Sequence, residues 1–178
     1  TVVDGMAADL ASQSPALGWL SVLDAPITAS LRGSIDDDGN LGPLFASISV
    51  EDGAIQPSPE AKPIPIGAAK TYLTYDPTGQ AVRFTRVEAE TGWGAFTASG
   101  QAYLRGADAD GWPQVFESQF TVNNLSFNPG ETYDEPLTFE RASADFRLSL
   151  EPFRIDVGNY ALTVQGQNVY GRGQVRTG

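Results

Sequence analysis

The chain has 178 residues, a formal net charge of −11 at pH 7, and neither cysteine nor histidine. Its length suffices for one domain with a sizeable core, and an apolar content of 41% argues against disorder. The negative charge argues against nucleic acid as a partner, and the missing residue types exclude thiol nucleophiles, imidazole bases and the usual zinc and haem ligands.

Residues 1–24 are the stretch in which apolar residues recur at the intervals of a helix. Met6, Leu10 and Ala11 recur at helical intervals, and Ser14 followed by Pro15 is a cap and first-turn pair that predicts a second short helix. We expect one or two short helices that cover one end of a sheet. A helix that binds a partner is the alternative.

Residues 25–105 alternate apolar and polar side chains, as half-buried strands do. Residues 36–40 and 76–79 have turn sequences, and Asp52 followed by Gly53 predicts a bulge or a tight turn. The proline-rich residues 56–65 predict a surface loop, because they cannot donate a regular ladder of hydrogen bonds.

Residues 112–176 repeat this plan after an interval of roughly 70 residues, so that the chain reads as two β-repeats. The matched segments are 48–57 with 120–129, 69–75 with 142–148, and 95–101 with 161–167. We predict about ten to twelve strands, mostly antiparallel because short turns join them.

In the second repeat, four alternating runs each place apolar side chains on one face. The residues that we predict to line this face are Phe116, Phe120, Val122, Phe146, Leu148, Phe153, Ile155, Leu162 and Val164. An antiparallel sheet must bury such a face against something. The sheet therefore either closes as a sandwich or barrel around an ordinary core, or curls into a trough that meets an apolar ligand.

No motif in the chain points to catalysis or to a cofactor. Residues 36–40 and 108–111 resemble a calcium loop only faintly and are expected to be solvated turns, because the bidentate glutamate and the flanking helices are absent. The strand carboxylates are expected on the wet face rather than as an acid and base pair of a glycosidase. They are Glu88, Glu90, Glu117, Asp145 and Asp156. A sugar-stacking platform is less expected than core packing or turn anchoring for Trp93, Tyr103, Trp112 and Tyr170.

Residues 14–17 and 20–27 mark a helix-to-strand entry, and a related pattern continues through residues 31–34, 39–40, 45–55 and 95–100. Together these segments resemble the AsmA-like family, the AsmA/TamB/YhdP group of Gram-negative envelope proteins. The resemblance covers nearly the whole chain as a pattern, without an invariant catalytic motif. This chain departs from a full member because it is short and has no run of about 20 apolar residues that could serve as an anchor.

The resemblance implies a segment of the periplasmic region of a large protein that is anchored in the inner membrane. Members build an elongated, taco-like sheet whose apolar groove is thought to carry phospholipid between the inner and outer membranes, in outer-membrane biogenesis. For this chain it implies a non-enzymatic role without a cofactor, a phospholipid or other acyl-chain lipid as ligand, and flanking segments of the same parent as neighbours. It implies membrane contact only through other parts of that parent. An extracytoplasmic β-sandwich module that binds glycan or protein is the alternative.

Overall fold

The computed structural model describes residues 2–12, 20–21, 23–56, 63–92, 94–107, 113–128, 134–149, 154–164 and 166–175. In chain order the elements are β1 (Val2–Met6), α1 (Ala7–Ala11), β2 (Leu23–Asp24), β3 (Pro26–Arg32), β4 (Leu44–Val50), β5 (Gly53–Ile55), β6 (Ile64–Asp76), β7 (Ala81–Thr91), β8 (Gly94–Ala107), β9 (Pro113–Phe127), β10 (Leu137–Ser149), β11 (Arg154–Val164) and β12 (Gln167–Val175).

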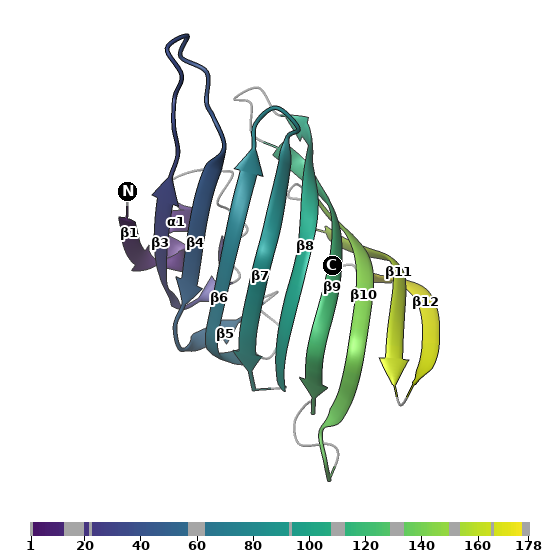
Figure 1. The fold of residues 1–178 in the computed structure, drawn as a ribbon. Helices are drawn as coiled ribbons and strands as arrows, with labels where there is room; N and C mark the ends of the chain where they lie inside the picture. Colours follow the sequence, from purple (N-terminus) through teal and green to yellow (C-terminus); the bar gives the residue numbers. More distant parts are fainter. Residues whose placement is uncertain are drawn as a thin grey trace.

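The strands form one 12-stranded antiparallel sheet that does not close on itself. Its order is β1-β3-β4-β6-β7-β8-β9-β10-β11-β12, and the short β5 pairs with β2 and β6 beside this path. Figure 1 shows a curved, open sheet with β1 and β12 at its two edges and α1 behind β3 and β4. The predicted fold class is confirmed. The sandwich alternative is wrong, because all described strands belong to a single sheet.

The two predicted repeats are parts of this one sheet, since β9 pairs with β8. The first two matched segments of each repeat pair in the same register: Val50 lies opposite Ala69, as Val122 lies opposite Ala142. The third matched segments are not equivalent, because residues 95–101 lie within β8 whereas residues 161–167 span the end of β11 and the turn to β12. The register of β4 with β6 is thus the same as that of β9 with β10 over these matched segments.

The start of the chain differs from the helical prediction for residues 1–24. Val2–Met6 form a strand that pairs with β3, and the helix begins only at Ala7. The β-branched Val2 and Val3 favour a strand, and β1 covers an edge of β3 that would otherwise be open. The predicted second helix falls mostly on residues 13–19, which lie outside the described residues.

Two predicted strand boundaries also move. β6 begins at Ile64, inside the predicted loop, because the carbonyl group of Pro65 can still accept a hydrogen bond, here from the amide group of Gly92 at 2.7 Å. In the second repeat, the runs before and after residue 158 are one strand, β11. A bulge between Val157 and Asn159 changes the alternation there, which a sequence reading takes for a strand end.

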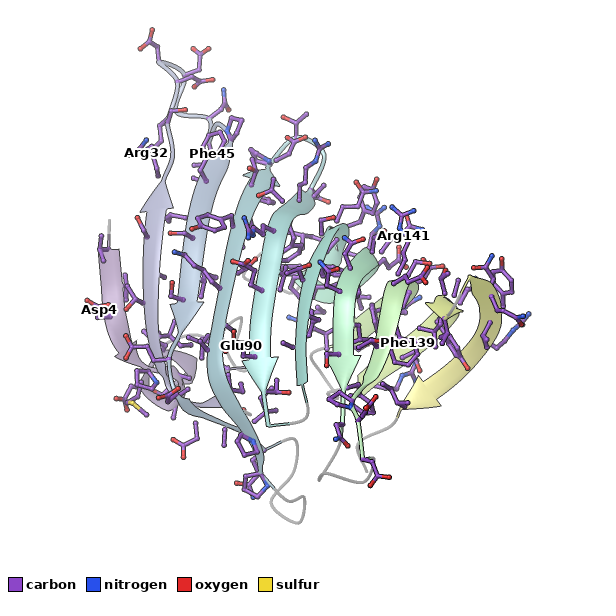
Figure 2. All side chains as sticks on the ribbon, turned by 60° about the horizontal axis from the view of Figure 1, so that its bottom comes forward. Asp4, Arg32, Phe45, Glu90, Phe139 and Arg141 are labelled. Carbon is purple, nitrogen blue, oxygen red and sulfur yellow. The ribbon has the colours of Figure 1, made fainter. Side chains whose placement is uncertain are left out.

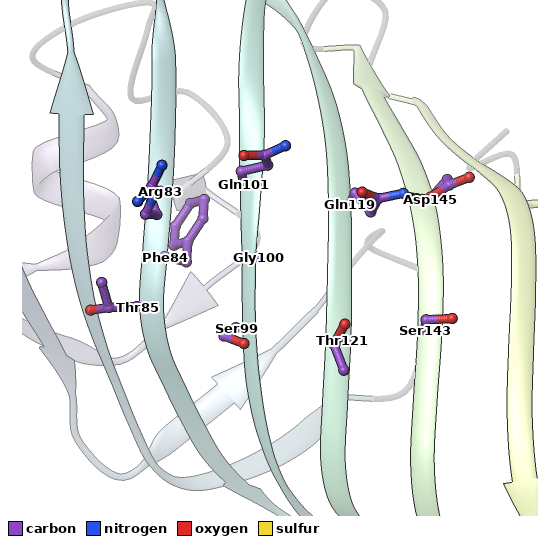
Figure 3. Close-up of a pocket in the computed structure, with 10 residues that line it drawn as sticks. All are labelled: Arg83, Phe84, Thr85, Ser99, Gly100, Gln101, Gln119, Thr121, Ser143 and Asp145. Atoms are coloured by element: carbon purple, nitrogen blue, oxygen red, sulfur yellow. Dashed lines mark hydrogen bonds between the residues drawn. The ribbon is translucent and has the colours of Figure 1, made fainter.

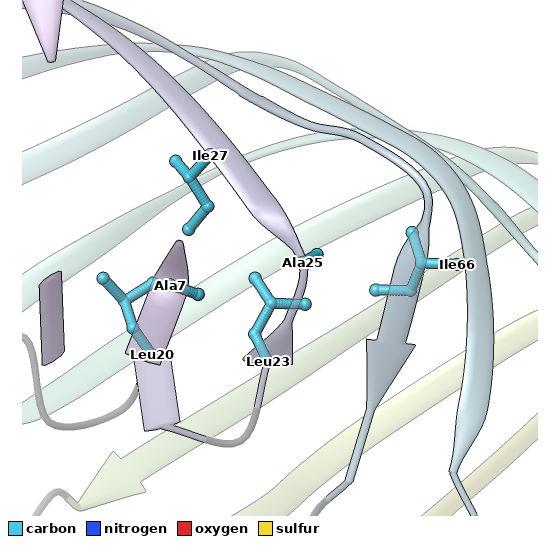
Figure 4. Close-up of a cluster of buried hydrophobic side chains, with 6 residues drawn as sticks. All are labelled: Ala7, Leu20, Leu23, Ala25, Ile27 and Ile66. Carbon is cyan, nitrogen blue, oxygen red and sulfur yellow. The ribbon is translucent and has the colours of Figure 1, made fainter. Parts of the chain in front are cut away.

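The enclosed core is small and lies at the N-terminal end of the sheet (Figure 4). Its buried side chains are Ala7, Leu20, Leu23, Ala25, Ile27 and Ile66. The partly buried Ile48, Val50 and Ala69 of β4 and β6 pack against this cluster. The helical segment therefore covers one end of the sheet, as expected, and leaves the remaining strands without a helical layer in the described part of the chain.

Residues 33–43 extend the β3–β4 hairpin beyond the sheet, and a tight turn closes its tip (Figure 1). The Asp36 carboxylate accepts hydrogen bonds from the amide groups of Asp38 at 3.0 Å and Asn40 at 2.7 Å. It also accepts one from the Asn40 side chain at 3.1 Å. The Asp36 carboxylate thus uses its oxygens to stabilise the turn itself, which agrees with the turn expected at residues 36–40.

Acidification is expected to loosen this turn. The hydrogen bond from the Asn40 side chain is the main cause that holds the pKa of Asp36 below its usual 3.8. A lowered pKa means that the stabilisation is complete above that usual value and is lost as the pH falls through the folded-state pKa. In NMR spectra taken from about pH 6 to about pH 2, the amide protons of Asp38 and Asn40 should move upfield. Unchanged shifts, or the same shifts in an Asp36→Ala variant, would contradict this assignment.

Candidate functional site

Most of the apolar residues in the strands from β6 to β11 lie on the side of the sheet where the N-terminal cluster lies, and β12 adds Val169 opposite Leu162. We call this surface the apolar face. Neighbouring strands carry it in register: Leu73 lies opposite Phe84, and Leu104 lies opposite Phe116. Side chains alternate along a strand, so residues two apart from these share the face. Its main members are Leu73, Val82, Phe84, Val87, Phe96, Ala98, Ala102, Leu104, Phe116, Phe120, Val122, Ala142, Ala144, Phe146, Leu148, Val157, Tyr160, Leu162 and Val164.

The structure brings the predicted lining residues together on three adjacent strands. Those with a described side chain are half-buried on the apolar face: Phe116, Phe120, Val122, Phe146, Leu148, Leu162 and Val164. Ile155 lies opposite Leu148 in the β10–β11 register. Phe153 lies outside the described residues.

Sequence reasoning missed the part of this face that the first repeat supplies, including Phe84, Phe96 and Leu104. A register shift between Phe84 and Val87 explains the omission at β7, because the bulge moves the apolar positions from even to odd numbers along the strand. A strict alternation search reads this change as two unrelated faces. A search that allows one inserted residue per strand would have included Phe84.

Three phenylalanine rings form a row across the middle of the apolar face. The ring centroids of Phe84 and Phe120 are 5.3 Å apart, and those of Phe120 and Phe146 are 6.3 Å apart. Phe84 and Phe120 lie on strands that flank β8, roughly 9.5 Å apart in backbone position. They meet because Gly100 lies opposite both and has no side chain to separate them. A Cβ atom at Gly100 would lie only 2.7 Å from Cδ1 of Phe120.

No described layer covers the apolar face beyond the N-terminal cluster. α1 packs mainly against β1 and β2. Outside that cluster, the buried apolar residues of the described part are the small Ala98, Ala102 and Ala142, which lie among larger side chains of the same face. The larger residues of this face from β7 to β11 are half-buried, and Val169 of β12 is 51% exposed. A wide apolar surface is therefore available to a ligand.

The opposite side, which we call the polar face, holds every lysine and arginine of the described part of the chain. They are Arg32, Lys70, Arg83, Arg86, Arg105, Arg141, Arg147, Arg154 and Arg172. Figure 2 shows Arg32 beside Phe45, its partner in the β3–β4 register. Many acidic residues lie instead in turns and loops, such as residues 36–38 and 51–52. The basic side chains are thus concentrated on the polar face, whereas many of the acidic side chains lie outside it.

The strand carboxylates lie on the polar face, as predicted, and most of them contact basic or amide groups. Glu117 lies 3.5 Å from both Arg105 and Arg147, on the strands at its two sides. Glu88 pairs with Arg86, and Asp156 with Arg154. Asp145 accepts a hydrogen bond from Gln119 at 3.1 Å. The ion pairs of Glu117 and Glu88 are largely exposed, so each stabilises the fold by less than about 1 kcal/mol, whereas the side chain of Asp156 is only 15% exposed.

A shallow depression of about 560 Å³ lies on the polar face over β7 to β10 (Figure 3). Its floor consists of Ser99, Thr121 and Ser143, which lie opposite one another across β8, β9 and β10. One rim consists of Arg83, Gln101, Gln119 and Asp145, which form the next row of side chains. We call this depression the polar trough.

The predicted packing of the aromatic residues is wrong for two of them. Tyr103 is 38% exposed and Tyr170 is 74% exposed, both on the polar face. Their neighbours in sequence lie on the apolar face, so alternation directs each tyrosine to the opposite side of the sheet. There the long phenol side chains extend into solvent. The Arg105 guanidinium lies 5.3 Å from the Tyr103 ring centroid, as expected for a cation–π contact. Trp93 and Trp112 lie outside the described residues.

Comparisons of the chain with protein-family models, with curated proteins and with solved structures find no match. Within the described ranges, acidic residues nowhere gather in a group of three or more that could hold a metal ion. No helix in that part of the chain has the length and apolarity of a membrane span. The two faces of the sheet are therefore the main surfaces from which a function can be argued.

Proposed function

We propose that this chain is a non-enzymatic, periplasmic segment of an AsmA-like protein, and that its apolar face binds the acyl chains of a phospholipid. In this role the chain would form part of a path for lipid between the inner and outer membranes of a Gram-negative cell. The parent protein would supply the membrane anchor and further strands. The observation that carries the proposal is the continuous apolar face from β7 to β12, which no described residue covers beyond the N-terminal cluster.

The chemistry of the apolar face suits a hydrocarbon ligand. Each methylene group that leaves water contributes about 0.8 kcal/mol, so an acyl chain needs apolar area more than any particular polar contact. Members of the face such as Phe120, Phe146 and Leu162 offer apolar area, and the large side chains among them are only half-buried. Loss of ligand freedom on binding reduces the net affinity well below the gross sum, which suits reversible uptake and release.

The arrangement of the face also suits a conduit better than a closed pocket. Large apolar patches that remain exposed on a protein usually mark a binding surface. This one runs across several strands without a described wall between β7 and β12. A chain-like ligand could therefore move along it while it exchanges one set of half-buried side chains for the next.

Two charges placed on the apolar face should abolish lipid uptake. We expect the wild-type chain, purified without detergent and mixed with phospholipid, to carry bound lipid in native mass spectra. The double variant Phe146→Asp with Leu148→Asp should carry none, because burial of two carboxylates against an acyl chain is strongly unfavourable. The matched control is Ser143→Asp with Ser149→Asp, which adds the same charge to β10 on the polar face. This control should bind lipid as the wild type does.

A second measurement does not depend on the folding of a variant. A photoreactive fatty acid, mixed with the wild-type chain, should label peptides of β9, β10 and β11 on their apolar-face residues. Wild-type protein that takes up no lipid, or labelling confined to polar-face residues, would refute the proposal.

A further inference from the structure

The polar trough has the features of a second binding site, separate from the apolar face. We propose that it binds an acidic oligosaccharide, which lies across β7 to β10 with widely spaced carboxylate groups. The inference goes beyond the lipid-binding proposal and does not rest on it, because the two surfaces are opposite sides of the same sheet.

The shape of the trough follows from the register of the strands. The short side chains of Ser99, Thr121 and Ser143 lie in one row. On one side of this row, two residues away on each strand, Gln101, Gln119 and Asp145 form a row of longer side chains (Figure 3). On the other side of the floor, Thr97, Asn123 and Arg141 form a third row. The floor of short side chains thus lies between a row of longer ones and a third row in which Asn123 and Arg141, but not Thr97, are longer than the floor residues.

The floor offers hydrogen-bonding groups that the protein does not use. A hydroxyl group provides one donor and two acceptor sites. Within the described part of the chain, the hydroxyl groups of Ser99, Thr121 and Ser143 have no hydrogen-bond partner. Gln119 uses only one amide proton, in its bond to Asp145. A ligand rich in hydroxyl groups can pair with such a row, since each of its groups is also both a donor and an acceptor.

The charges around the trough favour an anion of low charge density. Arg83 and Arg141 lie at diagonally opposite corners, on β7 and β10, roughly 19 Å apart by strand spacing and rise. Neither forms an ion pair with a described residue. Asp145 and Glu88 occupy the other two corners, and Glu88 is already paired with Arg86. Two available guanidinium groups can each bind a carboxylate, whereas Asp145 can accept a sugar hydroxyl.

This charge pattern distinguishes the ligand from other polyanions. A nucleic acid carries a charge about every 1.7 Å of duplex, a charge density that two guanidinium groups roughly 19 Å apart do not match. A uronic acid oligomer has fewer charges per unit length and many hydroxyl groups, which matches both the corners and the floor.

The test uses titration calorimetry of the full chain with a short oligogalacturonate, and with a maltooligosaccharide as the neutral counterpart. We expect binding of the acidic oligomer that weakens as salt is raised, and none of the neutral one. The variant Arg83→Gln with Arg141→Gln should weaken binding about tenfold or more. The matched control, Arg32→Gln with Arg172→Gln, removes the same charge from the polar face outside the trough and should change affinity less than about twofold.

A steric variant distinguishes binding in the trough from general attraction to the charges of the polar face. Thr121→Phe fills the floor without a change in charge and should abolish binding, whereas Ser30→Phe on β3 should leave it intact. Equal binding by the two arginine double variants would overturn the proposal. So would wild-type protein that binds anionic vesicles, or neutral oligomer, but no oligogalacturonate. A failure of lipid uptake on the apolar face would leave this result unaffected.

Discussion

Replacement of Gly100 by valine is expected to destabilise the fold by about 3 kcal/mol or more. A Cβ atom at this position would lie 2.3 Å from the carbonyl oxygen of Gln119 and 2.9 Å from Cγ of Phe120. The first contact is with backbone of the neighbouring strand, so it cannot be relieved by a rotamer change. The second displaces the ring that bridges Phe84 and Phe146. The midpoint of urea unfolding measures the loss, with the slope of the transition as a check on two-state behaviour.

Gly173→Val is the matched control for this substitution. A Cβ atom at Gly173, on the edge strand β12, meets nothing within 4 Å. Its valine variant should unfold within about 0.5 kcal/mol of the wild type. If Gly100→Val unfolds at the wild-type midpoint, the row of rings over Gly100 is wrong, and with it the central packing of the apolar face.

Truncation of Ile27 to alanine is expected to cost about 2 to 4 kcal/mol, the largest effect of any single truncation in the N-terminal cluster. Ile27 is 4% exposed and belongs to the cluster in which Ala7 of α1 meets the sheet. Since this cluster is the main enclosed core of the described residues, its loss should release the N-terminal cap before the strands of the second repeat. Hydrogen exchange then should rise first in β1 and β3.

Leu31→Ala provides the comparison within the same strand and on the same face. Leu31 is 46% exposed, so its truncation removes little buried area and should cost less than about 1 kcal/mol. Equal costs at both positions would mean that the cap contributes little to stability. In that case the long antiparallel ladder from β6 to β12 would have to stabilise the sheet by itself.

The two candidate sites depend on one structural property, namely the separation of apolar and polar side chains onto opposite faces of an open sheet. Closure into a barrel would hide the apolar face, and a second sheet would bury it. The open path from β1 to β12 leaves both faces accessible over most of its width. Among the described strands, β1 and β12 are the two edges of the sheet, and each has a single neighbour.

The alternation of residues determined much of this molecule. It predicted the high strand content. The turn sequences between the alternating runs predicted the turns at residues 36–40 and 76–79, and the short turns predicted the antiparallel order. The alternation also placed Phe120 with Val122, and Phe146 with Leu148, on common faces, as the register confirms. These properties are local, because the direction of a side chain along a strand depends only on its position relative to its immediate neighbours.

The tertiary structure alone decided what that alternation leaves open. It decided that the sheet stays open, that Val2–Met6 form an edge strand, and that Phe84 joins the phenylalanine row through Gly100. It also placed Arg83 and Arg141 on opposite sides of one row of hydroxyl groups. Each of these outcomes depends on which strands are neighbours and on bulges that shift their register. Such pairing joins residues far apart in sequence, so local periodicity cannot specify it.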